Sequence, residues 1–237
     1  MQVKYLTKDY FSEAAEQIAS YVTEKLESTN LILLLSGGST AKTYNYLAQL
    51  LIDSKLENLT IGLVDERYFP HGSEPKNFNS ILIKETDLYK KLAPKIKEFK
   101  LINYEALDMT MVVEDYNNFI ERSFLINSER VALLGIGTDG HTAGILPIFS
   151  NQEFQSKFES AELFTSYIAP DFPYRLSLTY TTLKKLTKVF VCLTGAEKKD
   201  QYLKLLATEN NFDLNTSYNY PAGILSVLPT ELLTDLS

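Results

Sequence analysis

The chain has 237 residues, of which 45% are apolar and 22% are charged, so it suits one globular α/β domain and not a disordered chain. Its formal net charge of -7 disfavours non-specific nucleic-acid binding, and a site for an anionic metabolite would have to gather cationic groups locally. A single cysteine, no signal-peptide core and no apolar run long enough to cross a bilayer together predict a cytoplasmic protein without disulfides or membrane contact.

The first half of the chain alternates between helical and strand-like segments. Apolar residues recur with helical spacing over residues 9–27, which predicts a helix. The run LILLL at 31–35 is continuously apolar, as is typical of a parallel strand that is covered on both faces. A helix from about 41 to 52, a strand over 59–64 and a short helix over 77–84 are predicted to follow.

The same alternation continues to the C-terminus. We predict strands over 97–102, 131–134, 175–179 and 189–193, and helices over 109–125 and 197–206. Cys192 lies within the apolar run of the last strand, where a buried structural thiol is a better interpretation than a nucleophile. Alternating strands and helices predict a mostly parallel sheet with helices on both faces. Ligands of such sheets bind beyond the carboxyl ends of the strands, so the loops directly after the apolar runs are the candidates for a site.

The first such loop follows LILLL and reads SGGST. Its glycines let the backbone approach a ligand closely, and the helix after it offers free N–H groups, which is an arrangement that binds phosphate. The alternative is a plain strand-to-helix turn with a hydroxyl side chain as the helix cap. The loop lacks the Walker A ending and the GxGxxG pattern, so ATP and NAD are disfavoured. The candidate phosphate-binding residues are Ser36, Gly37, Gly38, Ser39 and Thr40.

The second loop, 65–70, follows the strand LTIGLV and begins Asp65-Glu66-Arg67. Three charges at the end of a buried strand are unusual because unpaired charge is costly there. In the functional interpretation Arg67 faces an anion, while Asp65 contacts sugar hydroxyls or handles a proton. The alternative is a solvated turn that contains an Asp–Arg pair.

The third loop, GIGTDGHTAG at 135–144, is the most informative. It places His141 two residues after Asp139 among four glycines. A neutral imidazole, with an unperturbed pKa near 6.5, can accept a proton at cytosolic pH, and a neighbouring carboxylate can orient it. The chain's other histidine, His71, lies in a polar stretch and is predicted to be a surface residue.

Two cationic residues later in the chain also lie at the ends of predicted strands. Arg175 begins the strand RLSLT, and Lys198 lies just beyond the strand VFVCLT, in TGAEKKD. Each would otherwise be an ordinary solvated side chain.

Taken together, LLLSGGST, LVDERYFP and LLGIGTDGHTAGILP resemble the 6-phosphogluconolactonase family, which shares a fold with glucosamine-6-phosphate deaminase. The later RLSLT, GAEK and YPAGIL fit as well, so the resemblance covers nearly the whole chain. It implies a modified Rossmann-like α/β fold, with residues 1–237 as one domain. It also implies hydrolysis of 6-phospho-D-glucono-1,5-lactone to 6-phospho-D-gluconate, in the oxidative pentose phosphate pathway, with no metal and no cofactor.

The resemblance also implies roles for the candidate residues. His141 becomes the base that activates water, and Asp139 is its acidic neighbour. Phosphate and sugar contacts fall on residues 36–40, Arg67, Arg175 and Lys198. Whether Arg67 serves the phosphate or the lactone carbonyl stays open at this level.

Two alternatives belong to other functional classes. A deaminase or isomerase of glucosamine 6-phosphate typically has glutamate five residues after the histidine, where this chain has Leu146, and reads DEY where this chain has Asp65-Glu66-Arg67. A non-catalytic sugar-phosphate sensor would keep the phosphate loop but would need neither Asp139 nor His141. The expected partner is the small sugar-phosphate lactone, with no nucleic acid or membrane, and the expected state is a monomer or weak homodimer.

Overall fold

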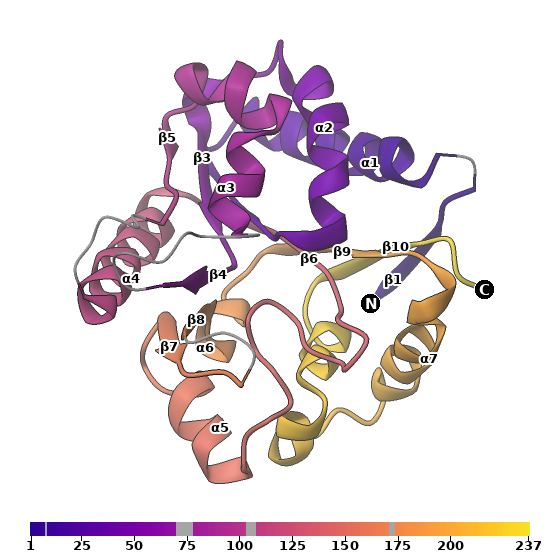
Figure 1. The fold of residues 1–237 in the computed structure, drawn as a ribbon. Helices are drawn as coiled ribbons and strands as arrows, with labels where there is room; N and C mark the ends of the chain where they lie inside the picture. Colours follow the sequence, from indigo (N-terminus) through magenta and orange to yellow (C-terminus); the bar gives the residue numbers. More distant parts are fainter. Residues whose placement is uncertain (8, 70–77, 103–107, 171–173) are drawn as a thin grey trace.

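The computed structural model describes residues 1–7, 9–69, 78–102, 108–170 and 174–237. Within these ranges, seven strands form one parallel sheet in the order β1-β10-β9-β6-β2-β3-β5 (Figure 1). The strands are β1 (Gln2–Tyr5), β2 (Leu31–Leu35), β3 (Leu59–Leu63), β5 (Glu98–Phe99), β6 (Glu129–Leu134), β9 (Lys188–Leu193) and β10 (Thr230–Thr234). The mostly parallel α/β architecture predicted from the sequence is therefore confirmed.

The centre of this sheet is where the apolar runs pair. Every residue of β2 is fully buried, as expected of a strand with helices on both faces. In the register of the sheet, Leu33 lies opposite Ile61 on one side and Val131 on the other. Cys192 is buried in β9, and burial raises the pKa of its thiol to about 12, which agrees with a structural role.

The helices cover the sheet from two sides. Figure 1 shows α1, α2 and α3 on one side of the parallel strands and α7 on the other. The helices are α1 (Tyr10–Leu26), α2 (Tyr44–Leu51), α3 (Asn79–Lys84), α4 (Met109–Ile126), α5 (Asn151–Phe158), α6 (Tyr180–Leu183) and α7 (Lys199–Thr208). The shorter segments include the 3-10 helices η1 (Gly38–Thr43), η5 (Ala196–Lys198) and η7 (Pro221–Ser226). None of the helices in the described part of the chain has the length and apolar character to span a bilayer.

A second, antiparallel sheet was not predicted. It has the order β4-β8-β7, with β4 (Asp65–Tyr68), β8 (Tyr174–Leu178) and β7 (Phe164–Tyr167). The stretch at 65–70 that we expected to be a loop therefore begins as a strand. Charged residues favour the loop interpretation from sequence, but here Glu66 and Tyr68 are buried behind the strand. The prediction for His71 and the start of the helix expected at 77 lie outside the described residues.

Candidate active site

The loops after β2 and β6 meet in a pocket of about 270 Å³ at the carboxyl ends of the parallel strands. The small sheet contributes β4 and β8, and η5 contributes one lysine. The pocket brings together ten of the eleven residues predicted as site residues, which are Ser36, Gly37, Gly38, Ser39, Thr40, Asp65, Arg67, His141, Arg175 and Lys198. The eleventh, Asp139, does not line the pocket but is hydrogen-bonded to His141 Nδ1.

The last three residues of SGGST already belong to the 3-10 helix η1, so this segment is shorter as a loop than the sequence indicated. The backbone turns at Gly38, with φ of +59°, directly into η1, and α2 follows. The cap residue of η1 is Gly37, with no side-chain cap bond, so the interpretation of a hydroxyl-capped turn is not what the structure has. The Ser36 hydroxyl donates to the Leu133 carbonyl at 2.6 Å, so its hydrogen is used within the protein.

The glycine-rich loop presents the imidazole of His141. Asp139 Oδ1 lies 2.6 Å from His141 Nδ1 and 3.1 Å from the His141 backbone nitrogen, so one carboxylate fixes both ring and main chain. A Cβ on Gly137 would lie 2.1 Å from His141 Nδ1, which explains why only glycine fits beneath the ring. Gly140, with φ of +90°, completes the turn and donates to the Gly137 carbonyl at 3.0 Å.

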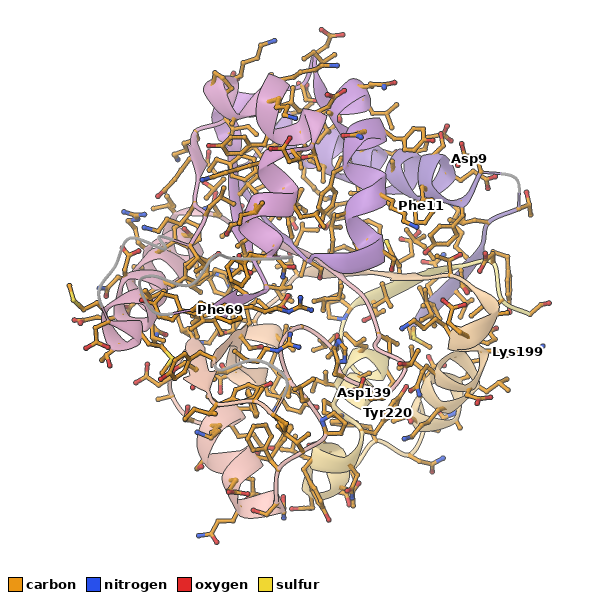
Figure 2. The ribbon with its side chains drawn as sticks, viewed as in Figure 1. Asp9, Phe11, Phe69, Asp139, Lys199 and Tyr220 are labelled. Carbon is orange, nitrogen blue, oxygen red and sulfur yellow. The ribbon has the colours of Figure 1, made fainter. Side chains whose placement is uncertain are left out.

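The C-terminal part of the chain supports this loop from below. Gln201 Nε2 donates to the Thr138 carbonyl at 2.7 Å, and Ala222 N donates to the Gly140 carbonyl at 3.0 Å. A Cβ on Gly140 would lie 2.6 Å from the Tyr220 ring, and Figure 2 shows Asp139 and Tyr220 together beneath the sheet. The YPAGIL segment thus helps to build the histidine loop.

The ionised carboxylate of Asp139 orients the imidazole of His141. The pKa of Asp139 is lowered to about 2, chiefly by its hydrogen bond with His141. Asp139 therefore stays ionised at every pH at which an enzyme of this kind would work. Because it accepts at Nδ1, the neutral histidine carries its proton there and leaves the Nε2 lone pair available.

The small sheet turns two arginines toward the pocket. Arg67 lies directly opposite Arg175 in the register of β4 and β8. Like charges in facing positions of two strands repel, and burial together with Arg175 lowers the pKa of Arg67. Lys198 adds a third cation, which donates to the Ile136 carbonyl at 2.8 Å, and burial lowers its pKa. A chain with a net charge of -7 has thus gathered positive charge where an anion would bind.

Asp65 is the acidic counterpart of these cations. It shares a face of β4 with Arg67 and is buried, with 8% of its surface exposed. Desolvation and Glu66 raise the pKa of Asp65 to about 6, against the opposing effects of Arg175, His141 and Arg67. Near neutral pH the carboxylate is mostly ionised, at a cost in folding free energy.

That cost gives a testable pH dependence. The pKa of Asp65 in the folded protein, about 6, lies above the ordinary value of 3.8, so the ionised carboxylate opposes folding fully above pH 6 and not at all below about pH 4. We expect Asp65→Asn to raise the melting temperature by about 2–6 °C at pH 8, and by nothing at pH 4. Thermal unfolding of both proteins across this range checks the expectation, and an equal gain at both pH values would contradict it.

Sequence reasoning missed two residues behind this strand. Glu66 accepts from the backbone N–H groups of Arg67, Asn79 and Ser80 at 2.7–2.9 Å and from the Ser80 hydroxyl at 2.6 Å, so it anchors the start of α3. Asn79 lines the pocket and contacts Asp65. The buried position of Glu66 could have been predicted from strand alternation, because side chains alternate between the two faces and Glu66 therefore points away from Asp65 and Arg67.

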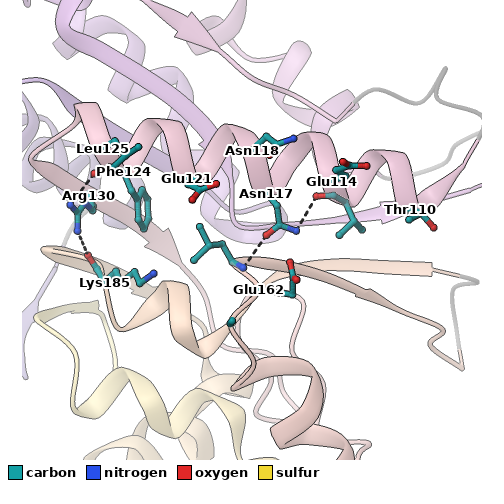
Figure 3. A pocket seen from close by; sticks show the side chains of 13 residues that line it. Thr110, Glu114, Asn117, Asn118, Glu121, Phe124, Leu125, Arg130, Glu162 and Lys185 are labelled. Carbon is teal, nitrogen blue, oxygen red and sulfur yellow. Dashed lines mark hydrogen bonds between the residues drawn. The ribbon is translucent and has the colours of Figure 1, made fainter.

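A larger hollow of about 800 Å³ lies along α4 (Figure 3). It contains none of the predicted site residues, and its lining mixes Glu114, Glu121 and Glu162 with Arg130 and Lys185. Asn117 crosses it and accepts from the backbone nitrogens of Leu163 and Phe164 at 2.9 Å. Its volume alone does not identify a site, and the convergent cations and imidazole lie in the smaller pocket.

Comparison with known proteins identifies the family. The family model described as glucosamine-6-phosphate isomerases/6-phosphogluconolactonase matches residues 7–227. The chain belongs to this family. A 6-phosphogluconolactonase of Xylella fastidiosa is 30% identical over 216 residues, which cover 85% of this chain and 80% of that protein. Within the family, the chain is thus a member of the 6-phosphogluconolactonases.

Solved structures agree on the fold. The chain is similar to the 6-phosphogluconolactonase of Thermotoga maritima, with a TM-score of 0.74, 20% identity and 98% of each chain covered. It is also similar to a monomeric glucosamine-6-phosphate deaminase, with a TM-score of 0.71, 17% identity, and 99% of this chain and 97% of that chain covered. Since both branches share the fold, the choice of reaction has to come from the site residues.

Proposed function

We propose that this 6-phosphogluconolactonase family member hydrolyses 6-phospho-D-glucono-1,5-lactone to 6-phospho-D-gluconate, with His141 activating the attacking water. The observation that carries the proposal is the shared pocket of the Asp139-paired imidazole, the SGGST loop and three cations. A hexose phosphate needs both a base and an anion site within one pocket, and the co-location of these groups supports the proposal.

In the proposed reaction His141 Nε2 removes a proton from water as the water oxygen bonds to the lactone carbonyl carbon. The carbonyl oxygen becomes an oxyanion, which backbone N–H groups of the glycine-rich loop stabilise. The ring C–O bond then breaks, and the imidazolium returns its proton to the departing ring oxygen. Asp139, held ionised, stabilises the imidazolium between the two transfers.

We assign the phosphate to the SGGST loop, Arg175 and Lys198, which line the same pocket as His141. Arg67 goes with them, because it faces Arg175 across the two strands and a dianion between the arginines offsets their repulsion. Asp65, ionised and buried beside them, is left to accept hydrogen bonds from sugar hydroxyls.

Residue 146 argues against the deaminase reaction. Where a deaminase would need a second proton-transferring carboxylate, Leu146 packs against the hydrophobic core and offers no ionisable group. The geometry of the histidine loop is compatible with either reaction, so this position discriminates between them.

The direct test is lactone opening on freshly generated substrate, with spontaneous hydrolysis subtracted. Acceleration of acid release by the purified protein is the expected result. The absence of acceleration, or ammonia release from glucosamine 6-phosphate, would overturn the proposal.

A further inference from the structure

Asn79 joins two of the loops that form the pocket. It is the first residue of α3 and is 9% exposed. Its backbone N–H donates to Glu66 at 2.9 Å, which fixes its main chain. Its side-chain nitrogen donates to the Asp65 backbone carbonyl at 3.0 Å and to Asp65 Oδ1 at 3.2 Å.

The other end of the same amide lies against the SGGST loop. A Cβ on Gly37 would lie 1.7 Å from Asn79 Oδ1 and 2.4 Å from its Cγ, so the amide occupies the space that a larger residue 37 would need. One side chain therefore contacts both the backbone assigned to the phosphate and the carboxylate assigned to the sugar.

The surroundings of Asp65 explain why this contact matters. Arg67 lies on the same face of β4 as Asp65, Arg175 acts on the carboxylate from β8, and His141 acts on it from the glycine-rich loop. Glu66 is next to it in the strand and points to the other face, but its negative charge still opposes ionisation of Asp65. The amide of Asn79 adds a neutral donor aimed at one carboxylate oxygen. A donor bonded to a carboxylate stabilises the ionised form over the protonated form.

We infer that Asn79 is a positioning residue, which holds the Asp65 carboxylate in its accepting form and sets its distance from the SGGST loop. The structural part of this inference stands on the contacts alone. Its kinetic consequence rests on the proposed function, since only an ionised Asp65 accepts from the sugar hydroxyls.

The first test does not use the lactone. In protein labelled with ¹³C at the aspartate carboxyls, the Asp65 signal, assigned by its loss in Asp65→Asn, is titrated in the wild type, in Asn79→Ala and in the near-isosteric Asn79→Leu. Without the amide donor, the titration midpoint of Asp65 is expected to rise by about one pH unit. A midpoint that is unchanged in both variants would overturn the inference.

A matched control is Asn127→Ala. Asn127 is 1% exposed and donates to the Ser123 carbonyl at 2.8 Å, but it lies at the amino end of β6, at the edge of the sheet away from the pocket. Its loss is expected to lower stability and leave the Asp65 midpoint in place. A midpoint that moves equally in this control would also contradict a specific role for Asn79.

A second test measures the contact with Gly37 by thermodynamic coupling. Gly37→Ala is expected to destabilise the protein when residue 79 is asparagine, and to be largely tolerated in an Asn79→Ala background, because the atoms it would meet are gone. Strict additivity of the two substitutions would refute the contact. This test holds even where one single variant folds poorly.

The kinetic test separates this inference from the proposed function. On the lactone, kcat/KM of Asn79→Ala is expected to fall about fivefold at pH 6 and to recover toward wild type at pH 8, as Asp65 ionises. A pH-independent loss would mean a merely structural role. If the wild type opens no lactone while the Asp65 midpoint still moves, the proposed function fails and the positioning role stands.

Discussion

Replacing His141 by alanine is expected to lower kcat for lactone opening by roughly 10²–10⁴-fold, the usual contribution of a positioned general base. The side chain lines the pocket with its Nδ1 held by Asp139, and it is the only imidazole among the described residues that line the pocket. Its side chain is 34% exposed, so the variant should fold, and circular dichroism and thermal unfolding would verify this. KM should change little, because the phosphate contacts remain.

Two companion variants sharpen this test. His71→Ala removes the only other histidine in the sequence and is expected to retain wild-type turnover. Asp139→Asn keeps the size of the orienting side chain but removes its charge, so it should lose activity to a smaller degree than His141→Ala. Near-normal turnover of His141→Ala would contradict the mechanism, even if the lactone is the true substrate.

The sequence predicted the centre of the fold well for a physical reason. The runs at 31–35, 131–134 and 189–193 are apolar throughout, and the run at 59–64 is interrupted only by Thr60 and Gly62, a pattern that is typical of strands covered on both faces. The helix predicted over 109–125 is observed as α4, Met109–Ile126, because its apolar face is regular. The edge strand β1 was not predicted. Its sequence QVKY is partly polar and partly exposed, and it pairs with β10 at the other end of the chain.

The same contrast holds for the site. Loop position, glycine content and residue chemistry led to residues that line one pocket, because parallel strands bring their carboxyl ends to one edge. They did not reveal that Arg67 lies in a strand opposite Arg175, because DERY has too many charges to be recognised as β-structure. They also missed Asn79, whose backbone N–H donates a hydrogen bond to the buried carboxylate of Glu66, a contact that no short motif encodes.

Replacing Arg67 by methionine is expected to raise KM for the phosphorylated lactone by roughly ten- to hundredfold, the usual loss for one charge-assisted hydrogen bond, with kcat little changed. On glucono-1,5-lactone, which has no phosphate, the same variant should match wild type. The reason is the placement of Arg67 against Arg175, which assigns both guanidinium groups to one anion. Steady-state kinetics on the two lactones, with spontaneous opening subtracted from each, measures this directly.

A different kinetic pattern would show that Arg67 contacts the lactone carbonyl and not the phosphate. If Arg67 instead stabilised the carbonyl oxyanion, kcat would fall on both lactones by a similar factor, because the carbonyl is common to them. Arg122→Met, which removes an exposed arginine on α4 paired with Glu98, controls for a general change in the charge of the protein and should alter neither substrate.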